Sequence, residues 1–290
     1  MPKVAVIRSS GLADASGGAK QSRFGALIDT GMRYLGLSWR DVVSPQDTVG
    51  IKVNCLGGMT ISTRPELAYA VAERVCAAGV APDRVIVFDR EDRELIAAGY
   101  EPCRDVGRVQ CYGTDTSPGG YEERLTESFS VGVRLSTIVT EQCTALISVP
   151  VVKDHMIAGM TGALKNHFGC IASPNKFHAD SCDPYVADFN AAPAIKRRHR
   201  LAICDASDIL YEGGPQDSPA HHYSYDGIVM GVDMVATDTV IWAIVDGVRR
   251  EKGLAALADE GRTPTYLATA ADRKLGVCRW DSIRIGEFTL

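Results

Sequence analysis

The chain has 290 residues, of which 46% are hydrophobic and 23% are charged, a composition typical of a folded, water-soluble protein. This composition excludes collagen-like, coiled-coil and disordered classes. Its 31 basic and 36 acidic residues give a formal net charge of −5, which disfavours nucleic acid and anionic membrane surfaces as partners.

Short β-branched runs alternate with segments whose apolar residues have helical spacing, which predicts an α/β architecture of mostly parallel sheets with flanking helices. In chain order, we expect strands at Val4–Arg8, Thr48–Asn54, Arg84–Asp89, Ala145–Val149, Leu201–Asp205 and Gly227–Val232. Helices are expected at Phe24–Leu35, Pro65–Ala78, Val235–Val248 and Thr263–Ala271. Ligands of open α/β sheets gather beyond the carboxyl ends of the strands, so we expect the site in the segments that follow the strands.

The length suits one large domain or two closely packed lobes. The stretch Gly113–Gly120, rich in Gly, Thr, Ser and Pro, is the best candidate for a hinge. It would divide the chain into an N-terminal α/β lobe of residues 1–115 and a C-terminal α/β lobe of residues 116–290, with a cleft between them. A single domain is the alternative.

The first residues run straight into the apolar alternation Val4–Ile7, without the long apolar segment of a secretory signal. The most apolar stretch, Val229–Val248, contains three aspartates, which are too costly for a bilayer span. We therefore expect a cytoplasmic protein; the alternative is an exported protein whose signal has been removed. The nine cysteines include no Cys-x-x-Cys pair, so we expect no intrinsic iron–sulfur cluster.

All six histidines lie between His155 and His222. Histidine is the commonest metal ligand and titrates near neutral pH, so this cluster indicates a metal site or a proton-transfer site. The cluster opens where an apolar strand runs into Lys153, Asp154 and His155, followed by glycines that let the backbone approach a ligand. The segment continues to Lys165, Asn166 and His167.

If residues 158–168 form a helix, Thr161 and Lys165 share one face and the amides at the helix start favour an anion. In the alternative interpretation, His155 and His167 fill a hydrophobic core and the lysines are solvated.

Two further segments carry candidate binding residues. His178 and Asp180 offer nitrogen and oxygen metal ligands in a proline-containing loop, although a surface histidine beside a loop-capping aspartate is the alternative. Arg64 stands just before Pro65 at a predicted helix start, where the helix dipole disfavours a cation. Recognition of a carboxylate or phosphate is a natural reason for its position, and a solvent-exposed arginine is the alternative.

At these residues the chain resembles a bacterial and archaeal family known as domain of unknown function three-six-two. The matching segments are Ile51–Asn54, Pro150–His155, Thr161–Gly169, Gly213–Pro215 and Asp233–Asp238. They span most of the chain.

A more distant resemblance concerns the spacing of His155, Ala158, Gly159, Thr161, Gly162 and Lys165. This spacing is similar to the motif His-x-x-Ala-Gly-x-Ser-Gly-Gly-x-Lys of nickel-pincer lactate racemase-like enzymes. The resemblance implies that His155 is an acid/base, that Lys165 anchors a pincer nucleotide through a thioamide, and that His178 is the nickel ligand. It also implies that Arg64 binds substrate or cofactor. Those enzymes place a second catalytic histidine after the strand that here ends at Asp89, and no histidine stands there.

These observations predict a metal- or metallocofactor-dependent enzyme, an isomerase or oxidoreductase, that acts on a small anionic carboxylate substrate by proton or hydride transfer. The expected catalytic residues are His155, Lys165, Lys153 and His167. The expected substrate-binding residues are Arg64, Asn166 and Asn54, the metal ligands for nickel or another divalent ion are His178 and Asp180, and the cofactor-binding residues are Lys165, Thr161 and Gly162. The alternatives are a non-catalytic metal or cofactor carrier and a metal-free hydrolase or lyase. The sequence does not indicate an oligomeric state.

Overall fold

One mixed sheet forms the centre of the molecule. The computed structural model describes all 290 residues. The main strands are β1 (Lys3–Arg8), β2 (Val49–Val53), β3 (Val85–Asp89), β4 (Gln110–Gly113), β7 (Ala145–Val149), β10 (His199–Leu210), β12 (Gly227–Gly231) and β13 (Arg284–Thr289). Their order is β13-β1-β12-β10-β7-β2-β3-β4, and neighbours are parallel except at β1/β12 and β12/β10. The expected mostly parallel α/β sheet is therefore confirmed.

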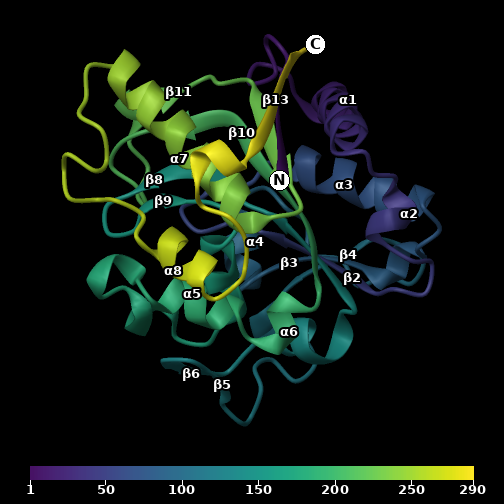
Figure 1. The fold of residues 1–290 in the computed structure, drawn as a ribbon. Helices are drawn as coiled ribbons and strands as arrows, with labels where there is room; N and C mark the ends of the chain where they lie inside the picture. Colours follow the sequence, from purple (N-terminus) through teal and green to yellow (C-terminus); the bar gives the residue numbers. More distant parts are fainter.

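Shorter strands extend this sheet to 11 strands. They are β8 (Val151–His155), β9 (Gly159–Thr161) and β11 (His222–Tyr223). β8 pairs with β10 in parallel and with β9 in an antiparallel hairpin. A separate hairpin is formed by β5 (Thr126–Ser128) and β6 (Val131–Val133), which lies at the bottom of Figure 1.

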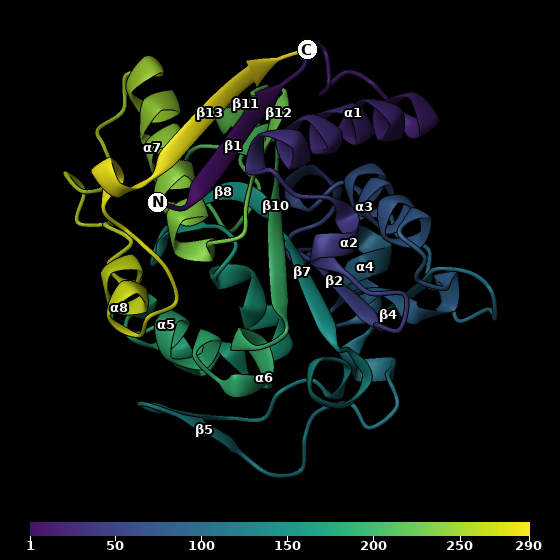
Figure 2. The same cartoon turned by 45° about the vertical axis from the view of Figure 1, so that its right-hand side comes forward.

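Helices cover both faces of the sheet (Figures 1 and 2). One face carries α1 (Gly17–Leu35), α2 (Trp39–Val42), α3 (Pro65–Ala77) and α4 (Asp92–Ala97), and the other carries α5 (Tyr185–Asn190), α6 (Pro193–Lys196), α7 (Met234–Glu251) and α8 (Tyr266–Asp272). Successive strand residues point to opposite faces, so β1 places Val4 and Val6 in one core and Ala5 and Ile7 in the other. The sheet is therefore buried on both sides.

All six predicted strands and all four predicted helices are present. Most of their ends shift by one to three residues, but α1 begins at Gly17 rather than Phe24 and β10 ends at Leu210 rather than Asp205. The helix considered for residues 158–168 is wrong. Gly159 has φ +79° and pairs with His155 in the β8–β9 hairpin, and a Cβ at Gly159 would meet the carbonyl oxygen of Arg262. A 3₁₀ helix, Lys165–Cys170, begins only after this hairpin. Thr161 and Lys165 thus do not share a helical face.

The sheet runs across the expected division at residue 115. β1 lies between β12 and β13, whereas β2 pairs with β7, so strands from both sides of residue 115 are neighbours in the sheet. The sheet order therefore does not separate the chain into two lobes. None of the helices combines the length and the apolar character that crossing a bilayer requires.

Candidate active site

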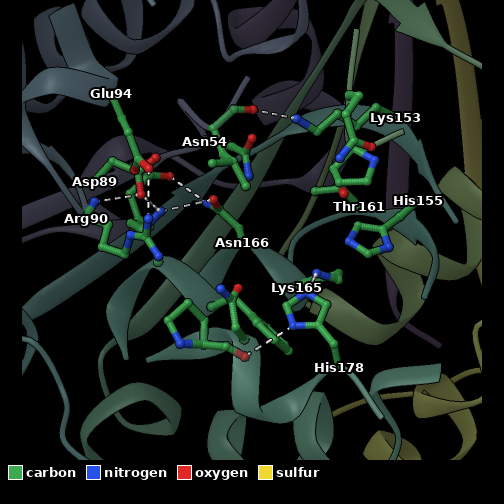
Figure 3. Close-up of a pocket in the computed structure, with 18 residues that line it drawn as sticks. Asn54, Asp89, Arg90, Glu94, Lys153, His155, Thr161, Lys165, Asn166 and His178 are labelled. Atoms are coloured by element: carbon green, nitrogen blue, oxygen red, sulfur yellow. Dashed lines mark hydrogen bonds and ion pairs between the residues drawn. The ribbon is translucent and has the colours of Figure 1, made fainter. Parts of the chain in front are cut away.

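A cavity of about 340 Å³ opens beyond the carboxyl ends of β2, β3 and β8 (Figure 3). This is the edge at which the strand pattern predicts a ligand site. Seven of the residues singled out in the sequence line it, namely Asn54, Lys153, His155, Thr161, Lys165, Asn166 and His178.

One end of the cavity is basic. Lys153 is buried on β8 and donates hydrogen bonds from Nζ to the carbonyl oxygens of Leu56, at 3.0 Å, and Ile61, at 2.9 Å. Burial and the nearby Lys165 lower the pKa of Lys153 to about 8. Burial likewise lowers the pKa of Lys165 to about 8. Because no carboxylate lines this end, two ammonium groups lack a counter-charge there, an arrangement that attracts an anion.

The His155 ring is held as a neutral hydrogen-bond donor. Its Nδ1 accepts hydrogen bonds from the backbone N–H groups of Ile157 and Ala158, both at 3.2 Å, so the ring proton resides on Nε2. Burial, reinforced by Lys165, lowers the pKa of His155 to about 2. The lone pair of Nδ1 is therefore occupied, and His155 can donate a hydrogen bond from Nε2 but cannot serve as a base at neutral pH.

His178 has the opposite tautomer. Its Nδ1 lies 3.2 Å from the carbonyl oxygen of Pro174, which can only accept, so Nδ1 carries the proton and Nε2 is the unprotonated nitrogen. That Nε2 lies 3.5 Å from Nζ of Lys165. The His178 and His155 rings stack with centroids 5.7 Å apart. Burial and Lys165 lower the pKa of His178, which keeps the ring unprotonated at neutral pH and available as a base.

The opposite end of the cavity contains a fixed ion pair that we did not predict from the sequence. Lys52 Nζ lies 2.7 Å from the Asp89 carboxylate, and both side chains are buried. Asn166 holds this pair in place: its Nδ2 donates to the Lys52 carbonyl oxygen at 2.7 Å, and its Oδ1 lies 3.4 Å from Lys52 Nζ. The feature of the sequence that could have indicated this ion pair is a lysine, Lys52, inside an otherwise apolar strand.

Three further polar groups complete this end. Glu94 pairs with Arg90 at 2.9 Å, and burial together with Asp89 raises the pKa of Glu94. Asn54 Oδ1 makes no hydrogen bond within the chain, which leaves an acceptor for a ligand. Arg90 and Glu94 come from the β3–α4 connection, after a strand end where we expected ligand-binding residues.

The structure does not bring Arg64 to the cavity. Its Nη1 donates to the carbonyl oxygens of Met59, at 2.7 Å, and Thr60, at 3.1 Å, and its Nη2 lies 3.5 Å from Asp208. The guanidinium thus stabilises the loop after β2. These contacts account for a cation at a helix start, and no anionic ligand is needed to explain it.

His167 belongs to the core rather than to the cavity. Its ring is fully buried, and Nδ1 lies 2.7 Å from Oδ1 of Asn190. Burial lowers the pKa of His167 to about 3, so the ring is neutral. The core-filling alternative considered for this histidine is the one that the geometry matches.

Gly162 and Asp180 also lie outside the cavity lining. Gly162 makes room for a carboxylate: a Cβ there would fall 2.3 Å from Oδ1 of Asp238. Asp238 accepts from the backbone N–H groups of Ala163, at 2.6 Å, and Leu164, at 3.0 Å, and so positions the start of the 3₁₀ helix that carries Lys165. Asp180 is exposed.

The donor set does not fit a metal ion held by protein side chains alone. No group of three or more His, Cys, Asp or Glu side chains is placed to hold one. A structural or catalytic site normally needs at least three protein donors. His178 and Asp180 alone do not supply such a donor set, and we derive no step through a metal ion.

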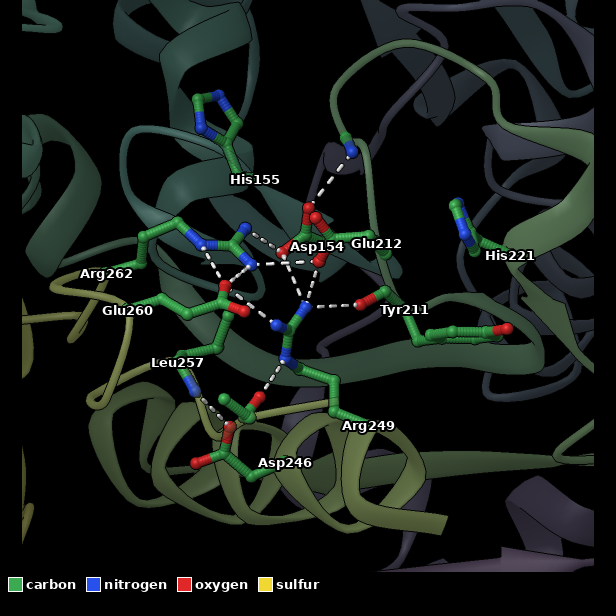
Figure 4. A network of polar contacts seen from close by, with 12 residues as sticks. Asp154, His155, Tyr211, Glu212, His221, Asp246, Arg249, Leu257, Glu260 and Arg262 are labelled. Carbon is green, nitrogen blue, oxygen red and sulfur yellow. Dashed lines mark hydrogen bonds and ion pairs between the residues drawn. The ribbon is translucent and has the colours of Figure 1, made fainter. Parts of the chain in front are cut away.

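A buried ionic network lies behind His155 (Figure 4). Asp154, next along β8, accepts from Arg262 at 2.7 Å and from the backbone N–H of Gly214 at 3.0 Å. The Met156 N–H donates to the Gly214 carbonyl oxygen at 2.8 Å. Burial raises the pKa of Asp154 to about 6. These bonds join the turn after His155 to the loop containing Pro215, which lines the cavity.

The sequence profile of the family described as "Domain of unknown function (DUF362)" matches residues 49–243. The chain belongs to the DUF362 family. The matched segment contains each cavity residue described above. No curated protein matches this DUF362 chain significantly.

Two solved structures are distantly similar to the DUF362 chain. The first is the lactate racemase apoprotein from Thermoanaerobacterium thermosaccharolyticum, with 12% identity over 79% of this chain and 54% of that chain and a TM-score of 0.47. The second is a protein from Thermotoga maritima, with 10% identity over 80% of this chain and 59% of that chain and a TM-score of 0.45. The DUF362 chain thus spans little more than half the length of either protein.

Proposed function

We propose that this DUF362 chain is an enzyme that removes a proton from a carbon next to the carboxyl or carbonyl group of a small carboxylate substrate. The observation that carries the proposal is the pair of stacked imidazoles with opposite tautomers. His178 keeps an unprotonated Nε2 in the cavity, whereas His155 presents an N–H. Proton abstraction needs an unprotonated base such as Nε2 of His178. The enolate oxygen that forms needs a hydrogen-bond donor such as the N–H of His155.

The remaining residues bind and orient the substrate. Lys153, held by two carbonyl oxygens, supplies the fixed cation for the carboxylate. Lys165 lies beside the base and adds positive charge where negative charge develops. Asn54 Oδ1 is free to accept a hydrogen bond from a hydroxyl group of the substrate. A neutral imidazole as the hydrogen-bond donor suits an enolate because it stays neutral throughout the pH range of activity.

Solvent deuterium exchange tests this proposal. The chain is incubated in D₂O with a panel of small 2-hydroxy and 2-oxo acids, and the loss of the proton signal at the carbon concerned is followed by NMR. We expect exchange with at least one acid, and we expect His178→Asn to lower its rate by about 100-fold or more, the usual contribution of a general base. The control is His221→Asn, a histidine outside the cavity, which should retain the rate. Exchange that is unaffected by His178→Asn, or no exchange with any acid, contradicts the proposal.

A metal-containing organic cofactor is the second candidate, and one observation favours it. The Lys165 amine lines the cavity and is not bonded to any carboxylate, so it is available to carry a nickel-pincer nucleotide of the kind that the resemblance implies. Elemental analysis together with the intact mass of the purified protein tests this candidate. Stoichiometric nickel and added mass on Lys165 support it, and an unmodified, metal-free protein that catalyses exchange excludes it.

A further inference from the structure

Lys153 and Lys165 lie in the same basic end of the cavity but differ in the groups that hold them. Lys153 donates to two carbonyl oxygens, and these contacts stabilise its ammonium form. Lys165 has no oxygen acceptor in the chain. Its neighbours include the Phe168 ring, whose centroid lies 4.2 Å from Nζ, and Nε2 of His178 at 3.5 Å. Loss of a proton from Lys165 therefore breaks no bond to an oxygen, and an imidazole lies beside it to take that proton.

We propose that Lys165 is a nucleophile that forms a Schiff base with the carbonyl carbon of a 2-oxo acid whose carboxylate is bound by Lys153. This proposal rests on the proposed function in one respect, that the cavity binds a small carboxylate. A desolvated amine next to another cation and next to a base is the arrangement by which enzymes activate lysine for this chemistry. The lowered pKa of Lys165, about 8, leaves part of the amine unprotonated at neutral pH.

The reaction needs no oxidant or reductant. The lone pair of Lys165 Nζ attacks C2, a C–N bond forms, and the electrons of the carbonyl π bond move onto its oxygen. One N–H proton passes through Nε2 of His178 to that oxygen, and a second proton comes from solvent. The oxygen then leaves as water, and a C2=N iminium remains. His155 Nε2–H is placed to hydrogen-bond the oxygen while it carries charge.

The iminium also explains why a base is needed in the same cavity. A positively charged C2=N group withdraws electrons from C3, which makes the C3 protons acidic. His178, which received the proton from Lys165, is returned to its free form by transfer of that proton to the departing oxygen. It is then available to abstract a proton from C3.

Reductive trapping tests the Schiff base. The full chain is incubated separately with glyoxylate, pyruvate and 2-oxobutyrate in the presence of sodium cyanoborohydride, followed by intact mass measurement and peptide mapping. We expect one adduct per chain, equal to the mass of the acid less one oxygen atom, located on Lys165. Acetone, which lacks the carboxylate, should label Lys165 at least tenfold more slowly than pyruvate because Lys153 cannot hold it.

Two variants sharpen the result. Lys165→Arg keeps the positive charge and should give no adduct, whereas Lys176→Arg, an exposed lysine of the neighbouring segment, should be labelled like the wild type. His178→Asn should slow adduct formation at least tenfold. The peptide map of the wild-type protein locates the adduct by itself, so the outcome does not depend on how well any variant folds.

The proposal is overturned if none of the three acids labels Lys165 or if the adduct lies on Lys153. It is also overturned if Lys165→Arg is labelled like the wild type, or if Lys165 already carries added mass in the isolated protein. Deuterium exchange without trapping would leave the proposed proton transfer standing and remove the Schiff base. Trapping without deuterium exchange would leave the Schiff base standing and remove the proposed proton transfer.

Discussion

Each histidine in the centre of the chain takes its chemical role from the atoms that its ring nitrogens contact. Two backbone N–H groups occupy Nδ1 of His155, and one carbonyl oxygen fixes the proton on Nδ1 of His178, so the two rings have different free nitrogens. The fully buried His167 instead meets Asn190 and remains in the core. Residue type alone therefore suggested His155 and His167 as catalysts and His178 as a metal ligand, and only His155 and His178 reach the cavity.

The buried His167 predicts a pH-dependent effect on stability. Its pKa is about 3 in the folded protein, below the ordinary value of about 6.5, so unfolding takes up a proton as the pH falls below 6.5. At pH 5 this proton uptake lowers the free energy of unfolding of the wild type by about 2 kcal/mol relative to its value at pH 7.5. His167→Gln cannot take up this proton. In urea titrations, we therefore expect the difference in unfolding free energy between the wild type and His167→Gln to be about 2 kcal/mol smaller at pH 5 than at pH 7.5.

A parallel variant checks the cause. The pKa of the half-buried His199 is lowered to about 4, so His199→Gln should show a pH dependence of the same sign. A loss of stability that is the same at both pH values would show that His167 is not held neutral in the folded state.

At the scale of single elements, the segment from β8 to the 3₁₀ helix Lys165–Cys170 positions most of the basic end of the cavity. The hairpin of β8 and β9 turns at Gly159, and the 3₁₀ helix is anchored by Asp238 of α7. This anchor fits only because Gly162 has no side chain. The local sequence favoured a helix here because its small and apolar residues also have helical spacing, whereas positive φ and close approach at the glycines exclude one.

Gly162→Ala tests this anchor. A Cβ would fall 2.3 Å from Oδ1 of Asp238, so either α7 or the 3₁₀ helix must shift. We expect a loss of about 1–3 kcal/mol in the free energy of unfolding, measured in urea, because overpacking of a buried site costs about that much. Activity should fall as well, because Lys165 moves with the 3₁₀ helix.

The matched control is Gly247→Ala in α7. No atom lies within 4 Å of a Cβ built at Gly247, so alanine should be accepted and should stabilise the helix by about 0.5–1 kcal/mol. Equal unfolding free energies for the two variants would mean that Asp238 does not constrain Gly162.

At the scale of the whole molecule, the sheet unites segments that the sequence suggested as two lobes. β2 pairs with β7, and β1 lies between β12 and β13. Each of the two cores also draws on both sides of residue 115: Ile86 packs in the same core as Leu146, and Val49 in the same core as Ile147. Removing either part would therefore expose strand edges and apolar surface of the other.

We accordingly expect one cooperative unfolding transition. Trp39 lies before residue 115, whereas Trp242 and Trp280 lie after it. Trp39→Phe leaves fluorescence only from the part after residue 115, and Trp242→Phe/Trp280→Phe leaves it only from the part before. For each variant, the midpoint of urea unfolding measured by fluorescence should equal the midpoint measured by far-UV circular dichroism. Transitions separated by more than the error of the measurement would indicate two independently folding parts.

The sequence by itself determined the elements and the edge of the sheet at which the cavity lies. Strands and helices follow from periods of two and 3.6 residues, which are properties of neighbouring residues, and the carboxyl ends of parallel strands necessarily meet at one edge. That reasoning placed Asn54, Lys153 and His155 close together, and the cavity contains all three.

Only the tertiary structure decided what each side chain does there. Arg64 bonds to carbonyl oxygens of its own loop, Asn166 holds Lys52 from more than a hundred residues away, and His178 meets Lys165 across a turn. Protonation, tautomer and nucleophilicity depend on such contacts because desolvation and nearby charges act through space and not along the chain. A lysine in a motif is therefore a candidate, and it becomes a cation or a nucleophile according to the atoms that surround it.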